Sequence, residues 1–291
     1  MKSTKGIILA GGKGTRLYPM TYVFSKQLQP VYDKPMVYYP LSTLMLAGIK
    51  DILIISTPDD TPNFQKLLGD GSQWGINLSY IVQQNPAGLP QAFILGEEFI
   101  ANDQSCLILG DNLFYGKLDF LRKGLNENSG GTVFAYKVDN PQDYGVVEFD
   151  KENKVISIEE KPNIPKSNFA IPGLYIFDNR ASLFSKELKP SQRGELEITD
   201  LQKCYLQNSE LNVQQIGRGV AWLDTGTPEA LLDAANFIQA IEKRQGLKIA
   251  CLEEIALIMN FIDENTFEIV VNNLPNCEYK NYCLKILKER K

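Results

Sequence analysis

The first half of the chain alternates short apolar runs with segments of helical periodicity, and this alternation limits the possible folds more than any other feature. Short apolar runs bounded by polar residues are typical of buried strands, and strands that alternate with helices form a mainly parallel sheet. The pattern predicts a doubly wound α/β domain with a parallel sheet at its centre. The predicted strands span residues 5–10, 51–56, 77–82, 105–109 and 132–138, and the predicted helices span residues 35–47 and 90–98.

The middle of the chain departs from this alternation. Two runs with strand character, residues 145–150 and 155–160, flank the polar turn at residues 151–154. This arrangement is typical of a β-hairpin, and it predicts a ligand-binding insertion in the α/β pattern.

A long helix is predicted after Thr227. Thr227 is a favourable N-cap, Pro228 suits the first helical position, and Gly246 ends the pattern. Its apolar side, which we expect to pack on the sheet, comprises Leu231, Leu232, Ala235, Phe237, Ile238 and Ile241. We therefore divide the chain into a core at residues 1–246 and a small helical C-terminal appendage at residues 247–291.

Composition narrows the chemistry that the chain can perform. It has 291 residues, a net charge of -5 and no histidine. A negative net charge gives no general attraction for nucleic acid or an anionic membrane, so we expect neither as a partner. Without histidine, the serine–histidine, cysteine–histidine and histidine–zinc sites are excluded, and carboxylate, lysine and arginine chemistry remains. The five cysteines lack the spacing of a zinc site or a disulfide framework, which indicates a reduced, cytoplasmic setting.

The first predicted strand runs into the glycine-rich sequence GGKGTR at residues 11–16. Glycines allow backbone N–H groups to approach phosphate oxygens closely, and Lys13 and Arg16 add positive charge, so we predict a phosphate-rich ligand. The loop is not a Walker A motif, because Gly14 follows the lysine, and not a dinucleotide fingerprint, because Leu17 stands where a glycine is required. Alternatively, the glycines make only a tight turn.

Two aspartates follow apolar stretches and are candidate metal ligands. Asp111 comes directly after the predicted strand 105–109, and Asp224 lies just before the helix that begins near Thr227. In α/β sheets ligands bind outside the carboxyl ends of the strands, where two carboxylates can hold Mg²⁺ against phosphate oxygens. The alternative for each aspartate is a helix cap or a turn.

Further charged candidates are Lys26, Glu160, Lys161 and Arg193. The carboxylate of Glu160 can accept hydrogen bonds from sugar hydroxyls, and the neighbouring lysine can hold a phosphate. The arginine, followed by glycine, can reach over a phosphate. Each of the four is also compatible with an ordinary solvated surface charge.

Seven sequence segments together resemble one family closely. They are LAGGKGTRL at 9–17, SKQLQPVYDKP at 25–35, LGDN at 109–112, YGVVEFD at 144–150, EEKP at 159–162, RGELEITD at 193–200 and WLDTGT at 222–227. Their order and content, with KIACLEEIA at 248–256, resemble the glucose-1-phosphate thymidylyltransferases over essentially the whole chain.

The resemblance implies a Rossmann-like core, with a mixed, mostly parallel central sheet flanked by helices and an inserted sugar-binding hairpin region. It implies a single in-line displacement that joins dTTP to glucose 1-phosphate and releases diphosphate, with Mg²⁺ as cofactor. Such transfer depends on positioning and charge stabilisation and needs no histidine.

The resemblance also assigns roles to individual residues. It places Gly11, Gly12, Gly14, Thr15, Gln83 and Gly88 on the nucleotide, the last two beside the thymine. It places Arg16, Lys26, Lys161 and Arg193 on the phosphates as catalytic residues. It places Asn112, Tyr144, Gly145, Glu160 and the backbone near Ile171 in the sugar pocket, and Asp111 and Asp224 on the metal.

Two segments differ from the family pattern. Pro172 stands where relatives have threonine, which removes a backbone donor and a hydroxyl beside the sugar pocket. Residues 257–259, Leu-Ile-Met, replace aromatic and basic residues that help relatives hold the end product at a regulatory site. We therefore expect feedback inhibition by dTDP-rhamnose to be weakened or lost. The family implies a homo-oligomer, commonly a tetramer.

Three alternatives remain open at this point. A uridylyltransferase would perform the same reaction with UTP, and the sequence around Gln83 does not determine the base. A non-catalytic nucleotide-sugar sensor of the same fold would be expected to lack a metal aspartate or a key lysine, and all are present. A nicotinamide-dependent oxidoreductase would need the glycine that Leu17 replaces.

Overall fold

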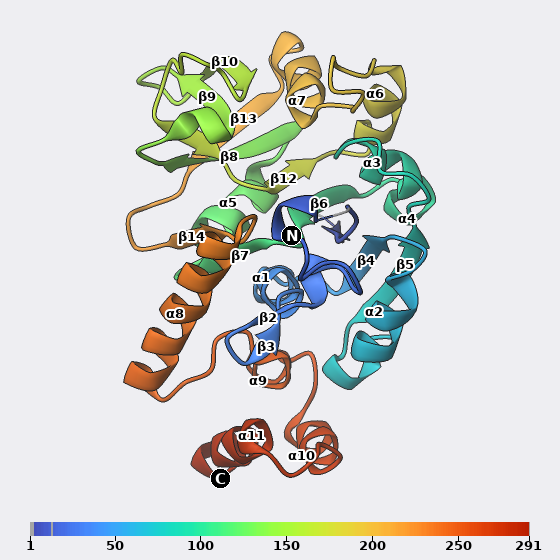
Figure 1. The fold of residues 1–291 in the computed structure, drawn as a ribbon, viewed down its shortest axis with the longest axis vertical. Coiled ribbons are helices and arrows are strands. Elements are labelled where there is room, and N and C mark those ends of the chain that lie inside the picture. The colour runs from blue at the N-terminus through green and yellow to red at the C-terminus, as the bar shows by residue number, and fades with distance from the viewer. Residues whose placement is uncertain (1–2, 13, 291) are drawn as a thin grey trace.

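The computed structural model describes residues 3–12 and 14–290, and the described part is built around one large sheet (Figure 1). Its strands are β1 (Thr4–Leu9), β2 (Pro30–Val31), β3 (Lys34–Pro35), β4 (Asp51–Ser56), β5 (Asn77–Val82), β6 (Gln104–Leu109), β7 (Asn112–Tyr115), β8 (Gly131–Lys137), β9 (Gly145–Phe149), β10 (Val155–Glu160), β11 (Phe169–Ile171), β12 (Leu174–Phe177), β13 (Leu211–Gln215) and β14 (Ala221–Asp224). The strand order of the large sheet is β10-β9-β11-β8-β12-β6-β1-β4-β5, and β13 pairs with β8. Two small two-stranded sheets, β14-β7 and β2-β3, lie beside it.

The strand directions divide the large sheet into two regions. Strands β6, β1, β4 and β5 are parallel neighbours, and β12 joins them to β8 through antiparallel pairing on both of its edges. The insertion formed by β9, β10 and β11 extends the sheet with antiparallel pairs. Because only β10, β11 and β12 run against the other strands of this sheet, the predicted mixed, mostly parallel sheet is confirmed.

Helices cover both faces of the sheet. They are α1 (Tyr38–Leu46), α2 (Thr61–Leu68), α3 (Gln91–Leu95), α4 (Glu97–Ile100), α5 (Asp119–Glu127), α6 (Ala181–Glu187), α7 (Ile198–Gln207), α8 (Pro228–Gln245), α9 (Leu252–Ile258), α10 (Glu264–Asn272) and α11 (Glu278–Arg290). Side chains on a strand alternate between faces, so Ile8 belongs to the cluster under α1, α2 and α5, whereas Ile7 and Leu9 belong to the cluster under α3, α4, α6 and α7. This two-sided burial explains why the parallel strands read as continuous apolar runs.

Most of the elements predicted from the sequence are present in the structure. The five predicted strands are β1, β4, β5, β6 and β8, and the predicted hairpin is β9 with β10. The predicted helix at 90–98 is instead the two short helices α3 and α4, because the chain turns at Gly96, where an added Cβ would lie 2.9 Å from the carbonyl oxygen of Ala92.

Helix α8 has the predicted ends but a different partner. The Thr227 hydroxyl accepts a hydrogen bond from the Ala230 N–H, and Gly246 adopts the left-handed conformation that ends the helix. The expectation that α8 packs on the large sheet was wrong, because it lies against the small-sheet strands β14 and β2 (Figure 1). The short link from β14 keeps the helix on that side. Leu232, which we placed on the buried side, is 61% exposed.

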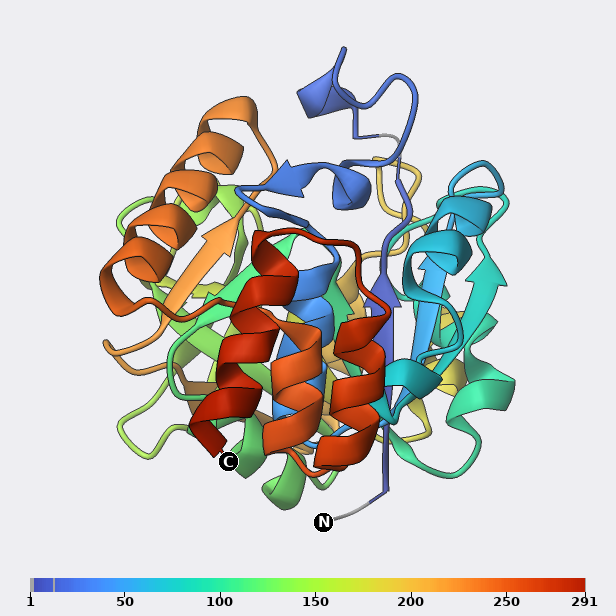
Figure 2. The ribbon, with the colours of Figure 1, turned by 90° about the horizontal axis from the view of Figure 1, so that it is seen from below.

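The tail forms three helices in its described part, α9, α10 and α11, which lie side by side (Figure 2). Helix α9 packs on α1, and apolar residues of all three helices belong to the hydrophobic cluster of the α1 face. Cys251 and Cys283, far apart in the sequence, are buried with their sulfur atoms 3.8 Å apart. Glu253 accepts a hydrogen bond from Trp74 Nε1 at 3.1 Å and another from Tyr279. The helical character predicted for residues 247–291 is confirmed.

A buried ion pair joins the start of the tail to the core. The ammonium of Lys34 lies 2.9 Å from the Glu242 carboxylate, and both side chains are almost fully buried. Asp33 contacts Lys34 and Lys248, and the backbone N–H of Ile249 donates to Glu242 at 2.8 Å. The network therefore connects β3, the end of α8 and the segment that leads to α9.

We expect Lys34→Met to lower the free energy of unfolding by about 3 kcal/mol, because it leaves the buried Glu242 carboxylate without its main partner. Chemical denaturation followed by circular dichroism measures the change. The matched control is Lys123→Met, whose exposed pair with Glu127 spans 3.9 Å and should contribute less than about 0.5 kcal/mol. Equal stability of the two variants would contradict the structural role of the Lys34 network.

Candidate active site

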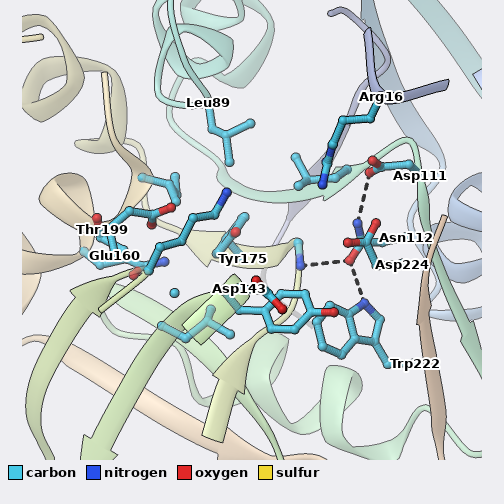
Figure 3. A pocket seen from close by; sticks show the side chains of 18 residues that line it. Arg16, Leu89, Asp111, Asn112, Asp143, Glu160, Tyr175, Thr199, Trp222 and Asp224 are labelled. Carbon is cyan, nitrogen blue, oxygen red and sulfur yellow. Dashed lines mark hydrogen bonds between the residues drawn. The ribbon is translucent and has the colours of Figure 1, made fainter. Parts of the chain in front are cut away.

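A pocket opens where the carboxyl ends of β1 and β6 meet the β9–β10 hairpin and α7 (Figure 3). It is lined by Arg16, Leu89, Leu109, Asp111, Asn112, Asp143, Tyr144, Gly145, Glu160, Lys161, Ile171, Gly173, Tyr175, Ile198, Thr199, Gln202, Trp222 and Asp224. A second, smaller cavity is lined by Gly11, Gly12, Gly14, Thr15, Arg16, Leu17, Lys26 and Gly226. Arg16 belongs to both, so the two cavities adjoin at this side chain.

The glycine loop after β1 has the backbone that its sequence predicts. Gly12 and Gly14 have φ values of 112° and 57°, which favour glycine. An added Cβ at Gly11 would lie 2.3 Å from Oε1 of Gln83, so the absence of a side chain lets this buried amide contact the loop. Lys13, the other predicted charge of the loop, lies outside the described residues.

Lys26 is paired with the buried carboxylate of Asp111. Asn112 Nδ2 donates to the same carboxylate at 3.0 Å, and Thr225 Oγ1 donates to the Asp111 backbone carbonyl at 2.9 Å. Burial alone would raise the pKa of Asp111, but the charge and hydrogen bond of Lys26 together with the Asn112 amide lower it below its usual value. Asp111 is therefore held as a carboxylate in the floor of the pocket.

Asp224 lies beside Asp111 because β14 pairs with β7, which places Asp224 opposite Asn112. Burial and, next, the negative charge of Asp111 raise the pKa of Asp224, and Lys26 and Arg16 offset only part of this effect. An added Cβ at Gly226 would lie 3.0 Å from Arg16 Nη2 and 3.1 Å from Asp224 Oδ1. A glycine at this position therefore leaves room for the arginine to approach Asp224.

The donor set of this corner fits a hard divalent cation. Two carboxylates converge there, and burial followed by repulsion from Asp111 raises the pKa of Asp224. Oxygen ligands are those that Mg²⁺ prefers, and a cation would relieve the repulsion. Asp111 and Asp224 are therefore the residues that could hold Mg²⁺ in this pocket.

Asn112 has its side chain fixed by the protein. Its Oδ1 accepts from Gly173 N at 3.0 Å and from Trp222 Nε1 at 2.6 Å, while its Nδ2 serves Asp111 (Figure 3). The Trp222 ring in turn contacts Tyr144 edge to face, with centroids 5.1 Å apart. The predicted sugar-binding residue Asn112 thus joins the carboxylate corner to the aromatic wall of the pocket.

The hairpin contributes Glu160 and Lys161, which end β10. Burial, followed by the charge of Glu197, raises the pKa of Glu160. Arg193 donates to Glu197 at 2.7 Å and lies 3.4 Å from Glu160, at the rim and not among the lining residues. Lys161 has a φ of 43°, an unfavourable conformation for a residue with a side chain, of the kind that concentrates at functional sites.

The two residues predicted to contact the thymine base, Gln83 and Gly88, have different surroundings. Gln83 donates to Gln91 at 2.6 Å and contacts the glycine loop. Gly88, with a φ of 106°, packs so closely on Leu196 that an added Cβ would lie 2.1 Å from its carbonyl oxygen. Gly88 therefore holds the loop that carries Leu89 against the segment before α7.

The structure brings together most of the predicted site residues. Arg16, Asn112, Tyr144, Gly145, Glu160, Lys161, Ile171, Asp111 and Asp224 line the pocket, while Gly11, Gly12, Gly14, Thr15 and Lys26 line the adjoining cavity. Pro172 is buried and is not among the lining residues.

Several lining residues were not singled out from the sequence. They include Leu89, Leu109, Asp143, Gly173, Tyr175, Ile198, Thr199, Gln202 and Trp222. Trp222 had a usable signal, since it begins the segment WLDTGT. Leu109, Ile198 and Thr199 likewise belong to the segments LGDN and RGELEITD. The others carry no local signal, because they come from elements that meet only in three dimensions.

Comparison with known proteins identifies close relatives. Residues 5–241 match the family model described as nucleotidyl transferase. A glucose-1-phosphate thymidylyltransferase from Neisseria meningitidis is 56% identical, over 98% of this chain and 100% of the relative. The enzyme of the same name from Mycobacterium tuberculosis is 53% identical, over 98% of this chain and 99% of the relative.

Solved structures show the same fold. A Bacillus anthracis chain assigned as a glucose-1-phosphate thymidylyltransferase, in complex with sucrose, is 40% identical with a TM-score of 0.75, covering 80% of this chain and 94% of that one. A UDP-glucose pyrophosphorylase in complex with UDP-glucose is 25% identical with a TM-score of 0.72, covering 83% and 99%. The sequence identity over nearly the full length and the shared fold agree with the geometry of the carboxylates, the glycine loop and the hairpin. The chain therefore belongs to the nucleotidyl transferase family and, within that family, to the glucose-1-phosphate thymidylyltransferases.

Proposed function

We propose that the chain converts dTTP and glucose 1-phosphate to dTDP-glucose and diphosphate by Mg²⁺-dependent in-line transfer. The observation that carries the proposal is the junction of the glycine-loop cavity and the main pocket at Arg16, beside Asp111 and Asp224. A nucleoside triphosphate on the loop and a sugar phosphate in the main pocket would meet at this junction. The names of the 53–56% identical relatives support the same substrates.

In the proposed reaction, a phosphate oxygen of glucose 1-phosphate attacks the α-phosphorus, the new P–O bond forms, and the bond to the departing diphosphate breaks. Mg²⁺, held by Asp111 and Asp224, would neutralise charge on the triphosphate. Arg16 and Lys26, which line the loop cavity, stabilise the departing diphosphate. Lys161 and Arg193 hold the sugar phosphate.

The main pocket binds and orients the sugar. Glu160 accepts hydrogen bonds from sugar hydroxyls, and Tyr144 and Trp222 provide an aromatic wall of the same pocket. Asn112 keeps its position through its three protein hydrogen bonds, so it presents a preorganised surface to the ligand. Correct orientation of two bound substrates is a major source of rate in such transfers.

The proposal includes a wider biological context. We place the product early in the synthesis of dTDP-rhamnose or related deoxysugars, in the cytoplasm, with a homotetramer as the working assembly. Among the described helices none has the length and apolar character needed to cross a membrane. Of residues 257–259, only Ile258 lines a tail-side cavity, together with residues of β7 and α9. We propose that feedback inhibition at that side is weakened or lost.

The runner-up is a uridylyltransferase, favoured by the fold shared with a UDP-glucose pyrophosphorylase. Pyrophosphate release with Mg²⁺ and glucose 1-phosphate, measured in parallel with dTTP, UTP, ATP, CTP and GTP, separates the two. We expect dTTP to give the highest kcat/KM. A preference for UTP would keep the mechanism and change the substrate, and no release with any nucleotide would favour a binding protein.

We expect Asp111→Asn to lower kcat/KM by at least about a hundred-fold, because it removes a carboxylate from the cation corner and the partner of Lys26. The control is Asp139→Asn, the same change at an exposed loop position, which should retain parental activity. Thermal unfolding of both variants establishes that the fold is intact. Activity of Asp111→Asn within a few-fold of the parent would exclude the proposed metal role.

A further inference from the structure

Helix α7 forms one wall of the main pocket, and this wall contains a buried polar side chain that makes no hydrogen bond to the described residues. Gln202 is 0% exposed, and neither its Oε1 nor its Nε2 has a hydrogen-bond partner among the described residues. Thr199, one turn earlier on the same helix face, is 1% exposed, and its hydroxyl is also unpartnered. Both residues line the pocket.

An unpaired amide is costly in this position. A buried polar group without a hydrogen bond destabilises a protein by about 1–3 kcal/mol, and an apolar residue of similar shape avoids that loss. The other inward positions of α7, Ile198, Leu201 and Tyr205, are filled by residues of the hydrophobic cluster. A glutamine among them therefore indicates that a ligand supplies the missing partners.

The chemistry of the amide limits what that partner can be. Nε2 donates and Oε1 accepts, so a complete match requires a group that does both. A sugar hydroxyl meets this requirement, whereas a phosphate only accepts and would leave Oε1 unpaired. The carboxylate corner with Asp111 and Asp224 lies on the opposite side of the pocket from Thr199 and Glu160 (Figure 3). The α7 wall thus faces the part of the pocket that lies away from the metal corner.

The neighbouring backbone leaves this wall open to a ligand. Gly145 begins β9 directly opposite α7, and an added Cβ there would lie 3.5 Å from Thr199 Cγ2 and 3.7 Å from Glu160 Oε2. A larger residue would fill the space between the hairpin and the helix. Glycine at this point keeps the polar face of α7 within reach of a bound sugar.

We propose that Gln202 hydrogen-bonds one hydroxyl of the bound sugar and thereby determines which hexose 1-phosphates the enzyme accepts. The inference depends on the proposed function, because it assumes a sugar phosphate in the main pocket. A site built to hydrogen-bond a substrate hydroxyl discriminates strongly against an analogue that lacks it, because the buried protein group is then left unpaired.

The test compares kcat/KM for glucose 1-phosphate and its 2-, 3-, 4- and 6-deoxy analogues in the parent and in Gln202→Met, which keeps length and helix propensity but removes the amide. In the parent, we expect kcat/KM for one deoxy analogue to be at least about tenfold lower than for glucose 1-phosphate, because that analogue leaves the Gln202 amide unpaired. In Gln202→Met, we expect the kcat/KM values for that analogue and for glucose 1-phosphate to differ by no more than about threefold, because the amide that the analogue would leave unpaired is absent. Gln202→Leu should give the same profile and serves as a second variant.

Two controls separate recognition from a structural role. Gln207→Met makes the same change at an exposed position of α7 and should preserve the parental profile. The melting temperature of ligand-free Gln202→Met should equal or exceed that of the parent, because an unpaired buried amide is removed. A lower melting temperature with equal losses for all five sugars would show that the glutamine is structural and would overturn the inference. An active parent whose profile Gln202→Met leaves unchanged would also overturn it, while a parent inactive with every sugar phosphate would instead refute the proposed function.

Discussion

The contact between Lys26 and the buried carboxylate of Asp111 is the interaction on which the rest of the site depends. It keeps a negative charge in the floor of the pocket, where burial alone would favour the neutral acid. Asn112, at the start of β7, and Thr225, just after β14, then hold the aspartate through hydrogen bonds to its carboxylate and its backbone carbonyl. The same Asn112 amide fixes Trp222, so the electrostatic corner and the aromatic wall form one connected structure.

The parallel region and the antiparallel region of the large sheet contribute different residues to the site. The parallel strands β1 and β6 end at the glycine loop and at Asp111, as expected for ligand binding at the carboxyl ends of such strands. The antiparallel insertion adds Glu160 and Lys161 on a hairpin, and α7 closes the opposite side. Arg16 stands between the two regions and lines both cavities.

The C-terminal tail packs on the core and is not a loosely attached appendage. Its helices share the hydrophobic cluster of α1, and the buried pair of Lys34 and Glu242 ties its first residues to α8 and β3. Removing the tail would expose that cluster, so its folding is coupled to that of the core.

The sequence by itself determined the elements whose signals are local: the apolar strands, the Thr227 cap with Gly246, the glycine loop and the strand-end aspartates. It also indicated most of the residues that line the two cavities, because motif and strand end coincide at Arg16, Asp111 and Asp224. Only the tertiary structure decided that α8 packs on β14 and β2 of the two small sheets, and that Gln202 faces the pocket with no partner among the described residues. Such facts depend on which distant segments meet, and a side chain's burial and hydrogen bonds are set by those neighbours and not by its own stretch of sequence.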